Sequence, residues 1–346
     1  MKLSEIKITP LLDTLRLEDI DDATYFSEKF SNYISNSRLS LINPDQNGCP
    51  KDFFEGLSKH VKFSDSLLFG SAIHELVLQP DSFFLVTTVD RPTAKAGLMA
   101  DELFNPDHLV PTDEAIIAAS DKVDYYKGKM TSKKINDLKI KCIDYWTQRA
   151  KFEADNADTR IPIYMDSKGR EKLQACLSSI DSNSDIESLL YPSKDIIKGN
   201  EKTILLDVLV EASEQKPIVL KLKSKLDNYT IDPNTNTITV NDVKTCGRPI
   251  VDFPYAVTNY HYNREIAMYS WLLTQCATKF YNMEHPEILG NFLVVETIPE
   301  FQSAVVPLTK DQILRGFREF KTLLKTVAFY CYNGYEDFGI PYDVQG

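Results

Sequence analysis

The chain has 346 residues, of which 43% are hydrophobic and 26% charged, a composition typical of a globular protein with one large or two modest domains. Its net charge of −11 argues against a general nucleic-acid coat protein, although an enzyme acting on DNA needs a favourable potential only at its cleft. No run of about 18 or more apolar residues occurs, so a membrane span is not expected.

Residues 1–32 lack the apolar core of a signal peptide, and we expect them to form a loosely ordered arm with a short amphipathic segment. The six cysteines of the chain are scattered without a Cys-x-x-Cys pair, which favours reduced thiols over a disulfide framework or a zinc site. These two features predict a cytoplasmic protein.

The first strong helix signal lies at residues 64–78, SDSLLFGSAIHELVL, where Ser64 or Asp65 can cap the start. This largely apolar helix carries His74 and Glu75, which are adjacent and therefore cannot share a face of it. At most one of the two can point to a common site. His74 is either a hydrogen-bonded core residue or a ligand, and both interpretations stay open at this point.

Residues 110–200 are mostly polar with helical spacing, which predicts a helical insertion. The segment contains a basic run with few acids in it, and this run is either the solvated face of a helix or a surface that contacts phosphates. The lysines of the run are Lys122, Lys127, Lys129, Lys133, Lys134, Lys139 and Lys141.

A three-stranded antiparallel meander is predicted for residues 202–244, because β-formers alternate along it and turn formers occupy positions 233–236. The turn sets the register of the last two strands if Asp232 pairs with Thr237. Near the turn, the face that the two strands share is apolar, and further along it becomes charged.

Two aspartates meet in this register, because Asp227 opposes Asp242. Lys225 opposes Lys244 one strand period further on, so all four side chains share one face. Directly opposed like charges are destabilising, and the two carboxylates therefore need a compensating cation. That cation is either a divalent metal or the lysines themselves, in a self-neutralising cluster on a solvated face.

A long helix follows at residues 258–281 and places Glu265 and Tyr269 on one face, since they are four residues apart. Two more strands and a closing amphipathic helix are predicted at residues 292–295, 303–306 and 309–331. The order of helices, antiparallel strands, helix, strands and helix predicts an α+β fold.

Four of these elements, in this order, resemble the PD-(D/E)xK nuclease superfamily. They are the glycine-led helix GSAIH, the single acid of KLD, the strand segment DVKT, and the following helix with Glu265 and Tyr269. Within the superfamily the chain is similar to phage exonucleases of the exodeoxyribonuclease VIII and RecB-nuclease-like group. The stretches FGSAIHELVLQPDSF, RPTAKAGLMADELF and NYHYNREIAMYSWLL also resemble phage-encoded members, and the resemblance covers roughly residues 33–330.

The resemblance implies a restriction-endonuclease-like core within residues 33–346, that is, a mixed sheet with an antiparallel meander flanked by helices. A large helical N-terminal part, with the helical insertion at about residues 110–200, completes the expected nuclease domain. The arm at residues 1–32 would precede this domain.

The resemblance also implies a Mg²⁺ site, with Mn²⁺ as an alternative ion and with Asp227 and Asp242 as ligands. The main-chain carbonyl of Val243 is the expected third ligand, and His74 adds an imidazole. Lys244 would orient or deprotonate the attacking water and stabilise negative charge on the phosphate.

Glu265 and Tyr269 would line the DNA side of this site. The family usually has glutamine at the position of Glu265, and a glutamate can accept a hydrogen bond but cannot donate one as glutamine does. Some related nucleases use an acid on the histidine helix, so Glu75 is an alternative to His74, although the glycine-led spacing favours His74.

By family analogy, we expect a Mg²⁺-dependent exonuclease that digests linear double-stranded DNA and leaves a single-stranded tail for recombination. A single-strand annealing protein is then an expected partner, a ring-shaped homo-oligomer an expected assembly, and the host cytoplasm the expected location if the chain is phage-encoded. One alternative is a structure-specific endonuclease. We expect it to lack an iron–sulfur cluster, because only Cys276 and Cys331 lie where related enzymes cluster their cysteines. The other is a non-catalytic DNA-binding protein that retains the fold.

Overall fold

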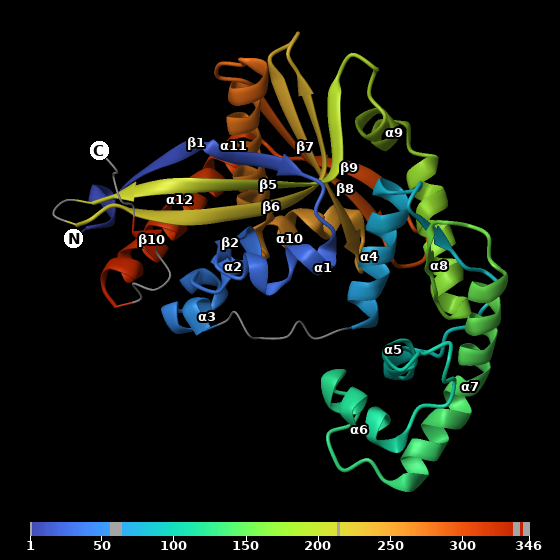
Figure 1. Cartoon of the computed structure of the whole chain (residues 1–346). Helices are drawn as coiled ribbons and strands as arrows, with labels where there is room; N and C mark the ends of the chain where they lie inside the picture. The colour runs from blue at the N-terminus through green and yellow to red at the C-terminus, as the bar shows by residue number, and fades with distance from the viewer. Residues whose placement is uncertain (1, 56–63, 213–214, 335–339, 342–346) are drawn as a thin grey trace. The chain divides into compact units, whose positions relative to one another are not determined.

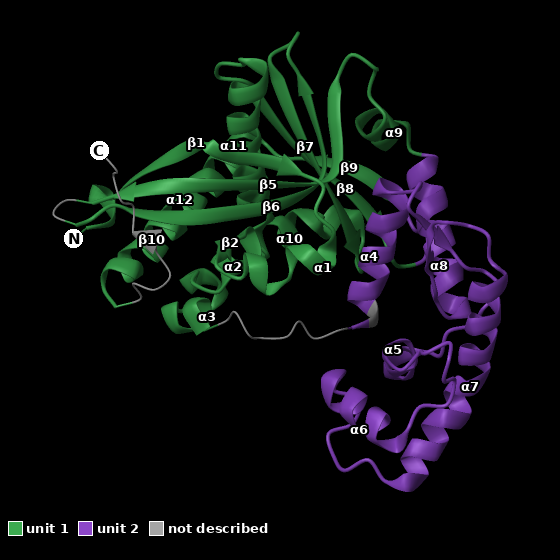
Figure 2. Ribbon diagram, in the orientation of Figure 1, with its two compact units in different colours: residues 1–59, 183–298, 303–346 green, residues 60–182, 299–302 purple. Residues whose placement is uncertain are grey.

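The computed structural model of the protein describes residues 2–55, 64–212, 215–334 and 340–341 (Figure 1). Two compact units make up the chain (Figure 2). Each unit has its own hydrophobic core. The first unit comprises residues 1–59, 183–298 and 303–346, and the second comprises residues 60–182 and 299–302.

A mixed sheet of eight described strands forms the centre of the first unit. Its order is β1-β5-β6-β7-β8-β9, and two short strands, β2 and β10, both pair with β6. Neighbouring strands are antiparallel except for the parallel pairs β7–β8 and β2–β6. The strands are β1 (Lys7–Glu18), β2 (Tyr33–Ile34), β5 (Ile197–Glu211), β6 (Ile218–Asp232), β7 (Thr237–Cys246), β8 (Glu287–Glu296), β9 (Ser303–Pro307) and β10 (Ile340–Pro341).

The strands β5, β6 and β7 are the antiparallel meander that the sequence predicts. Asp232 pairs with Thr237 at the turn, where Asn236 adopts the left-handed conformation (φ 53°) that asparagine tolerates well. Ile231 pairs with Ile238 next to the turn, Tyr229 pairs with Val240 one step further on the same face, and all four side chains are buried. The predicted register and the apolar stripe near the turn are therefore confirmed.

Strand β1 corrects the expectation of a loosely ordered N-terminal arm. Residues 7–18 pair antiparallel with β5 and end the strand order on one side. The register shifts between Leu11 and Arg16, and the strand contains Pro10, which lacks a backbone N–H and is tolerated on an edge strand. The proline and the register shift interrupt the alternation by which a strand is recognised in a sequence.

Two long helices, α11 (Tyr262–Tyr281) and α12 (Lys310–Tyr332), pack against each other, and α11 also lies on β7. Gly316 permits this approach, because a Cβ there would lie 2.2 Å from the carbonyl oxygen of Asn263 on α11. The shorter helices of this unit are α1 (Asp22–Tyr25), α2 (Asn36–Ser40), α3 (Pro50–Glu55), α9 (Ser184–Leu190) and α10 (Phe253–Asn259), with 3-10 turns η1 (Leu3–Glu5), η2 (Glu28–Phe30), η3 (Pro44–Gln46) and η5 (Ile250–Asp252).

The helix predicted at residues 258–281 is two helices in the structure. Helix α10 ends at Asn259, and His261 adopts a left-handed conformation (φ 54°) before α11 begins. The strands and the closing helix predicted further along the chain are confirmed as β8, β9 and α12. Thr309 and Gln312 form a reciprocal capping box at the start of α12, which explains where this helix begins.

The second unit is mainly helical, and its core contains the fully buried Met99, Ile116 and Trp146. Its elements are α4 (Asp65–Leu78), α5 (Ala94–Glu102), α6 (Asp113–Lys122), α7 (Ser132–Asp155) and α8 (Ser167–Asp181), with β3 (Phe83–Leu85) and β4 (Ile161–Ile163) as a parallel pair. The helix predicted at residues 64–78 is confirmed as α4, with Ser64 as its N-cap. The sequence places the helical segment at about 110–200, whereas this unit begins near residue 60 and ends at residue 182.

Several lysines of the basic run have partners within the second unit. Lys122 lies 2.7 Å from the carboxylate of Glu102, and Lys139 lies 2.7 Å from that of Asp113. The ammonium of Lys134 lies 3.2 Å from the centre of a tyrosine ring. These contacts fit a solvated helix face whose charges are partly compensated inside the unit.

The α+β fold class predicted from the sequence is confirmed, with a mixed sheet, an antiparallel meander flanked by helices, and a large helical part. The core of the first unit joins side chains of the meander to those of the two long helices, among them Val240, Ile266 and Leu324. Over the residues that the structure describes, no helix has the length and apolar composition that a membrane crossing requires.

Candidate active site

Five of the side chains predicted to be functional lie together in the first unit, on β6, β7 and α11. The Lys244 ammonium is 2.6 Å from Asp242 Oδ2 and 3.4 Å from Glu265 Oε2. The Tyr269 hydroxyl donates a hydrogen bond of 3.1 Å to Glu265 Oε1, and Asp227 Oδ2 accepts one of 2.8 Å from a β7 main-chain N–H. The structure therefore joins the hairpin acids to the helix pair that the sequence places on one face.

The hairpin departs from its predicted register at the acids themselves. Ladder pairing between β6 and β7 runs from the turn to Asn228 and Asn241 and ends there. Beyond this point Asp227 accepts a hydrogen bond from the main-chain N–H of Val243 on β7, and the predicted pair Asp227–Asp242 is not among the paired residues of the ladder. Because like charges facing each other are destabilising, a hydrogen bond from a backbone donor is a better partner for Asp227.

Lys225 is also placed differently from the prediction. The sequence sets it opposite Lys244 in one charge cluster, but the Lys225 ammonium pairs with Asp22 of α1 and lies 3.1 Å from Glu201 Oε2 on β5. Lys244 has its own partners on β7 and α11, and its ammonium lies 5.1 Å from the centre of the Tyr262 ring. The self-neutralising cluster of two lysines and two aspartates is therefore not what forms.

Asp242 is a buried carboxyl with an incomplete set of partners. Only 1% of the residue is exposed, and burial raises its pKa well above the usual range, with repulsion from Asp227 and Glu265 adding to the rise and Lys244 opposing it. Oδ2 is close to the Lys244 ammonium but poorly aligned with it. Among the described residues this oxygen accepts no hydrogen bond of good geometry.

The electrostatics keep Lys244 protonated. Burial by itself would lower the pKa of its ammonium, but the carboxylates of Asp242, Glu265 and Asp227 outweigh burial and hold the pKa well above its usual value. Burial likewise raises the pKa of Tyr269, and Glu265 adds to that rise. Lys244 is consequently a cation, and Tyr269 is a neutral phenol that can donate its proton to Glu265 in a hydrogen bond.

Glu201 is an acid of this region that the sequence reasoning missed. It lies on β5 between the pairs Asn200–Asn228 and Lys202–Leu226, which sets it across from Asp227. It has a left-handed backbone (φ 51°), and one of its carboxylate oxygens lies within 4.8 Å of one of Asp227. The meander register supplies the signal that could have found it, because the residue opposite a functional aspartate on the next strand is a candidate ligand.

A row of asparagines crosses the sheet beside the acids. Asn200, Asn228, Asn241 and Asn291 are successive partners on β5, β6, β7 and β8. Each amide nitrogen after the first donates to the side-chain oxygen of the previous asparagine, at 2.7, 2.7 and 2.9 Å. We call these four residues the asparagine row, and their neighbours Asp227 and Asp242 the acid pair.

The predicted residues His74, Glu75 and Val243 remain to be placed. His74 and Glu75 lie on α4 in the second unit, and both are half-buried. Val243 is buried on β7, and its N–H is the donor to Asp227. The roles of the His74 imidazole and of the Val243 carbonyl as metal ligands stay predictions.

The donor set of the first unit fits a hard divalent cation. Four carboxylates gather here, those of Glu201, Asp227, Asp242 and Glu265, against the two ammonium groups of Lys225 and Lys244. The buried Oδ2 of Asp242 has the Lys244 ammonium 2.6 Å away but no hydrogen bond of good geometry among the described residues, so its hydrogen-bonding capacity is not filled. Carboxylate oxygens are the ligands that Mg²⁺ and Mn²⁺ prefer in proteins.

No family model matches the chain, and no curated protein matches its sequence. Among solved structures, the chain is similar to the crystal structure of a provisionally named exonuclease from Eubacterium rectale. The two chains are 12% identical, the match covers 92% of this chain and 88% of that chain, and the TM-score is 0.47. This likeness concerns the course of the chain alone and carries no argument about activity.

Proposed function

We propose that the protein is a metal-dependent nuclease that hydrolyses phosphodiester bonds in DNA. One observation carries the proposal: Oδ2 of the buried Asp242 carboxyl lies 2.6 Å from the ammonium of Lys244 and has no hydrogen bond of good geometry among the described residues. Burying a carboxyl beside a lysine costs desolvation free energy, and strongly perturbed titratable pairs of this kind are common at functional sites. Metal binding and stabilisation of phosphate charge are tasks that suit this pair.

Asp227 and Asp242 are the proposed metal ligands, with Glu201 as a third carboxylate in the first unit and with the Val243 carbonyl and His74 as further candidates. The backbone N–H of Val243 donates to Asp227 Oδ2 and so fixes the direction of this carboxylate. When bound, a Mg²⁺ or Mn²⁺ ion supplies Lewis-acid polarisation of the phosphate and activation of water.

Lys244 acts in this proposal as a fixed positive charge. Its ammonium can donate a hydrogen bond to a phosphate oxygen or to the attacking water, and it stabilises the negative charge that grows on the phosphate. The three surrounding carboxylates favour the protonated form, so orientation and charge stabilisation suit Lys244 better than proton abstraction does. It is held in place by Asp242 on β7 and Glu265 on α11.

Glu265 has a role here that needs only an acceptor. Its Oε1 accepts a hydrogen bond from the Tyr269 hydroxyl, and its Oε2 lies 3.4 Å from the Lys244 ammonium. A glutamine would offer Lys244 a neutral oxygen, whereas glutamate offers a charge. The departure from the family's glutamine is thereby compatible with the proposed site, since Glu265 positions Lys244.

The finer proposal is an exonuclease that resects linear double-stranded DNA for recombination, as in the phage exonucleases that the motifs resemble. Under this proposal a single-strand annealing protein would receive the single-stranded tail, and a ring of identical subunits would hold the duplex. The sequence motifs support this finer proposal.

The test is incubation of the protein with end-labelled linear duplex and with covalently closed circular duplex, in Mg²⁺ and in EDTA. We expect the linear DNA to shorten from its ends in Mg²⁺, the circle to persist, and both to persist in EDTA. Lys244→Met should remove the activity. Lys221→Met is the matched control, because Lys221 lies on β6 in an ion pair with Asp207 outside the site, and it should stay active.

Each other result has a defined meaning. Cleavage in EDTA, or an active Lys244→Met variant, would overturn the proposed site. Cutting of the circle would replace the exonuclease by the endonuclease alternative. Binding of linear DNA without cleavage in Mg²⁺ would favour the non-catalytic DNA-binding protein.

The ligand role of His74 needs its own measurement. With His74→Ala we expect the Mg²⁺ concentration for half-maximal activity to rise while the affinity for DNA in EDTA is unchanged. If the variant instead has a lower melting temperature and an unchanged Mg²⁺ requirement, then His74 is a structural residue of α4.

A further inference from the structure

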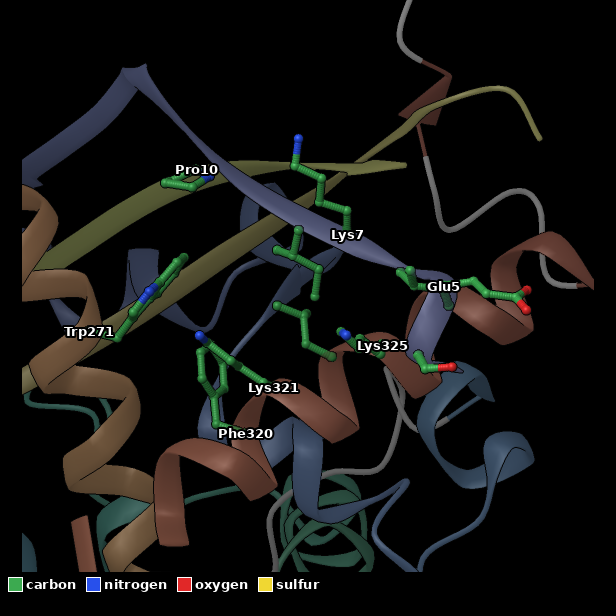
Figure 3. Close-up of a pocket in the computed structure, with 11 residues that line it drawn as sticks. Glu5, Lys7, Pro10, Trp271, Phe320, Lys321 and Lys325 are labelled. Atoms are coloured by element: carbon green, nitrogen blue, oxygen red, sulfur yellow. The ribbon is translucent and has the colours of Figure 1, made fainter. Parts of the chain in front are cut away.

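A cavity of about 400 Å³ opens on the first unit at the start of the chain and is lined by η1, β1, α11 and α12. Figure 3 shows the residues that line it. Its principal side chains are Ile6, Lys7, Trp271, Phe320, Lys321 and Lys325. Small-molecule sites in proteins have cavities of this order of size, lined by apolar and aromatic groups with a few polar ones.

One wall of the cavity is aromatic. Trp271 of α11 is half-buried, and its ring centre lies 5.6 Å from that of Phe320 on α12, which is itself 1% exposed. A buried ring on one side restricts the movement of the Trp271 indole, and the open side of the cavity leaves part of the indole accessible. Such a fixed, partly exposed indole is a platform on which a flat ring can stack.

The other side of the cavity is basic. Lys321 and Lys325 are one turn apart on the same helix, so their side chains lie on one face of it. Lys7 of β1 also lines the cavity, but its ammonium lies 3.7 Å from the carboxylate of Glu211, and Glu5 is the one acid among the described residues of the lining. The whole chain carries a net charge of −11, so a lining with three lysines and one acid is a local reversal of sign.

The cavity and the acid pair use different faces of helix α11. Tyr269 reaches the site through Glu265, and Trp271 is two residues further along, which is about 200° around a helix. None of the lining residues belongs to the acid pair, the asparagine row or the other proposed metal ligands. The cavity can therefore be tested separately from the nuclease activity.

We propose that this cavity binds a nucleoside phosphate, with the base against Trp271 and the phosphate at Lys321 and Lys325. An aromatic platform beside two adjacent ammonium groups matches a ligand that carries a flat ring and an anion close together. The ligand is either a free nucleotide or the phosphorylated terminal nucleotide of a DNA strand. This inference stands on the cavity alone and does not depend on the proposed nuclease function.

The chain offers a direct reporter, because it contains two tryptophans, Trp146 and Trp271. The variant Trp146→Phe, combined with Asp242→Asn and kept in EDTA, leaves Trp271 as the only indole in a protein that cannot cleave DNA under the proposed mechanism. We expect dAMP to quench its fluorescence in a saturable manner. Deoxyadenosine alone and inorganic phosphate alone should each bind at least about tenfold more weakly, because each offers half of the ligand.

Variants of the basic wall complete the test. Lys321→Ala with Lys325→Ala should weaken dAMP binding by about tenfold or more, whereas Lys310→Ala, on the same helix but paired with Glu287 outside the cavity, should not. A 5′-phosphorylated single-stranded oligonucleotide that binds more tightly than dAMP would identify a strand end as the source of the ligand. Weaker binding of the oligonucleotide would identify the free nucleotide.

Trp146 is buried in the second unit, so its replacement can impair folding. Equilibrium dialysis of radiolabelled dAMP against the unmodified chain in EDTA therefore gives a second measurement. Absence of binding at millimolar dAMP in the dialysis would overturn the proposal. So would an equal loss of binding in the Lys310→Ala control and in the double variant.

Discussion

The acid pair and the asparagine row are neighbours in sequence, but they differ in how completely their side chains are hydrogen-bonded. Asn228 follows Asp227 on β6, and Asn241 precedes Asp242 on β7, so the two sets face opposite sides of the sheet. In the asparagine row each amide nitrogen after the first donates to the side-chain oxygen of the previous asparagine, on the adjacent strand. In the acid pair, one buried oxygen of Asp242 has a charged neighbour and no aligned donor among the described residues.

This difference separates what stabilises the sheet from what is available for chemistry. The asparagine row is uncharged and hydrogen-bonded across four strands, so it holds β6 and β7 in register at the last pair before they part. The acid pair lies just beyond that point, where the backbone ladder no longer fixes the strands. A satisfied polar row beside a charged and incompletely satisfied one is the arrangement expected where a fold supports a reactive site.

The largest expected effect is on the rate of DNA cleavage, when an asparagine replaces one aspartate of the acid pair. Asp242→Asn removes a proposed metal ligand and the closest anion of Lys244 with almost no change in shape. We expect the rate of Mg²⁺-dependent cleavage of linear duplex to fall by about 10²–10³-fold, the size of effect typical for loss of one electrostatic group from an active site. Single-turnover degradation measures it, and a rate within tenfold of the parent protein would remove Asp242 from the site.

Much of this comparison could be predicted from the sequence, because its origin is local. The turn formers at 233–236 and the alternation on either side fix the register near the turn, and that register brings Asp227 near Asp242. The helical spacing of Glu265 and Tyr269 likewise survives as a hydrogen bond. Only the last step failed, since the strands separate at the acids and Asp227 turns to a backbone donor.

The parts that could not be predicted depend on contacts between distant segments. The asparagine row joins four strands, and the chain reaches the last of them, β8, only after helix α11. Asparagine is also a poor strand former, so no local sequence pattern predicts the row. Glu201 was missed because its left-handed backbone marks an interruption in β5 that an alternation pattern does not show. Strand β1 was missed because Pro10 and a register shift break its alternation.

The second prediction tests whether the asparagine row stabilises the sheet as a unit. Asn241→Leu leaves buried groups of Asn228 and Asn291 without their partners, at a cost of about 1–3 kcal/mol for each group. We therefore expect the free energy of unfolding to fall by about 2–4 kcal/mol in urea denaturation. Leucine at positions 228, 241 and 291 together also removes the two amides that Asn241→Leu leaves without a partner, and this triple variant should recover part of the lost stability. If each further leucine instead lowers the free energy of unfolding by a similar amount, the amides contribute to stability independently.

The third prediction compares two lysines: Lys244, which is surrounded by carboxylates, and Lys223, which lies among aromatic rings. Burial, with Arg38 adding to it, lowers the pKa of Lys223 to about 8, and its ammonium donates to the carbonyl oxygen of Tyr25 at 2.7 Å. Between pH 8 and the ordinary value of 10.5 the unfolded chain holds a proton that the folded chain lacks, so stability should rise with pH across this window.

Lys223→Met isolates that rise from the titration of other lysines. The stability of the parent protein relative to this variant should increase by on the order of 1–2 kcal/mol from pH 8 to pH 10.5, as measured by urea denaturation at each pH. Below pH 8 the relative stability should be constant, since both states are then protonated. A difference that stays flat over the whole range would mean that Lys223 keeps an ordinary pKa.

The smallest expected effect again concerns Asp242, now in stability instead of catalysis. A carboxylate that is 1% exposed and repelled by Asp227 and Glu265 is costly to bury, and an asparagine of the same shape carries no charge. In EDTA at neutral pH, Asp242→Asn should therefore raise the melting temperature slightly, while Asp13→Asn, which changes an exposed acid in the same unit, should leave it unchanged. If Asp242→Asn lowers activity and raises stability, then Asp242 serves catalysis at a cost to the stability of the fold. If Asp242→Asn lowers the melting temperature instead, the ion pair with Lys244 stabilises the fold, and the contrast between the acid pair and the asparagine row would disappear.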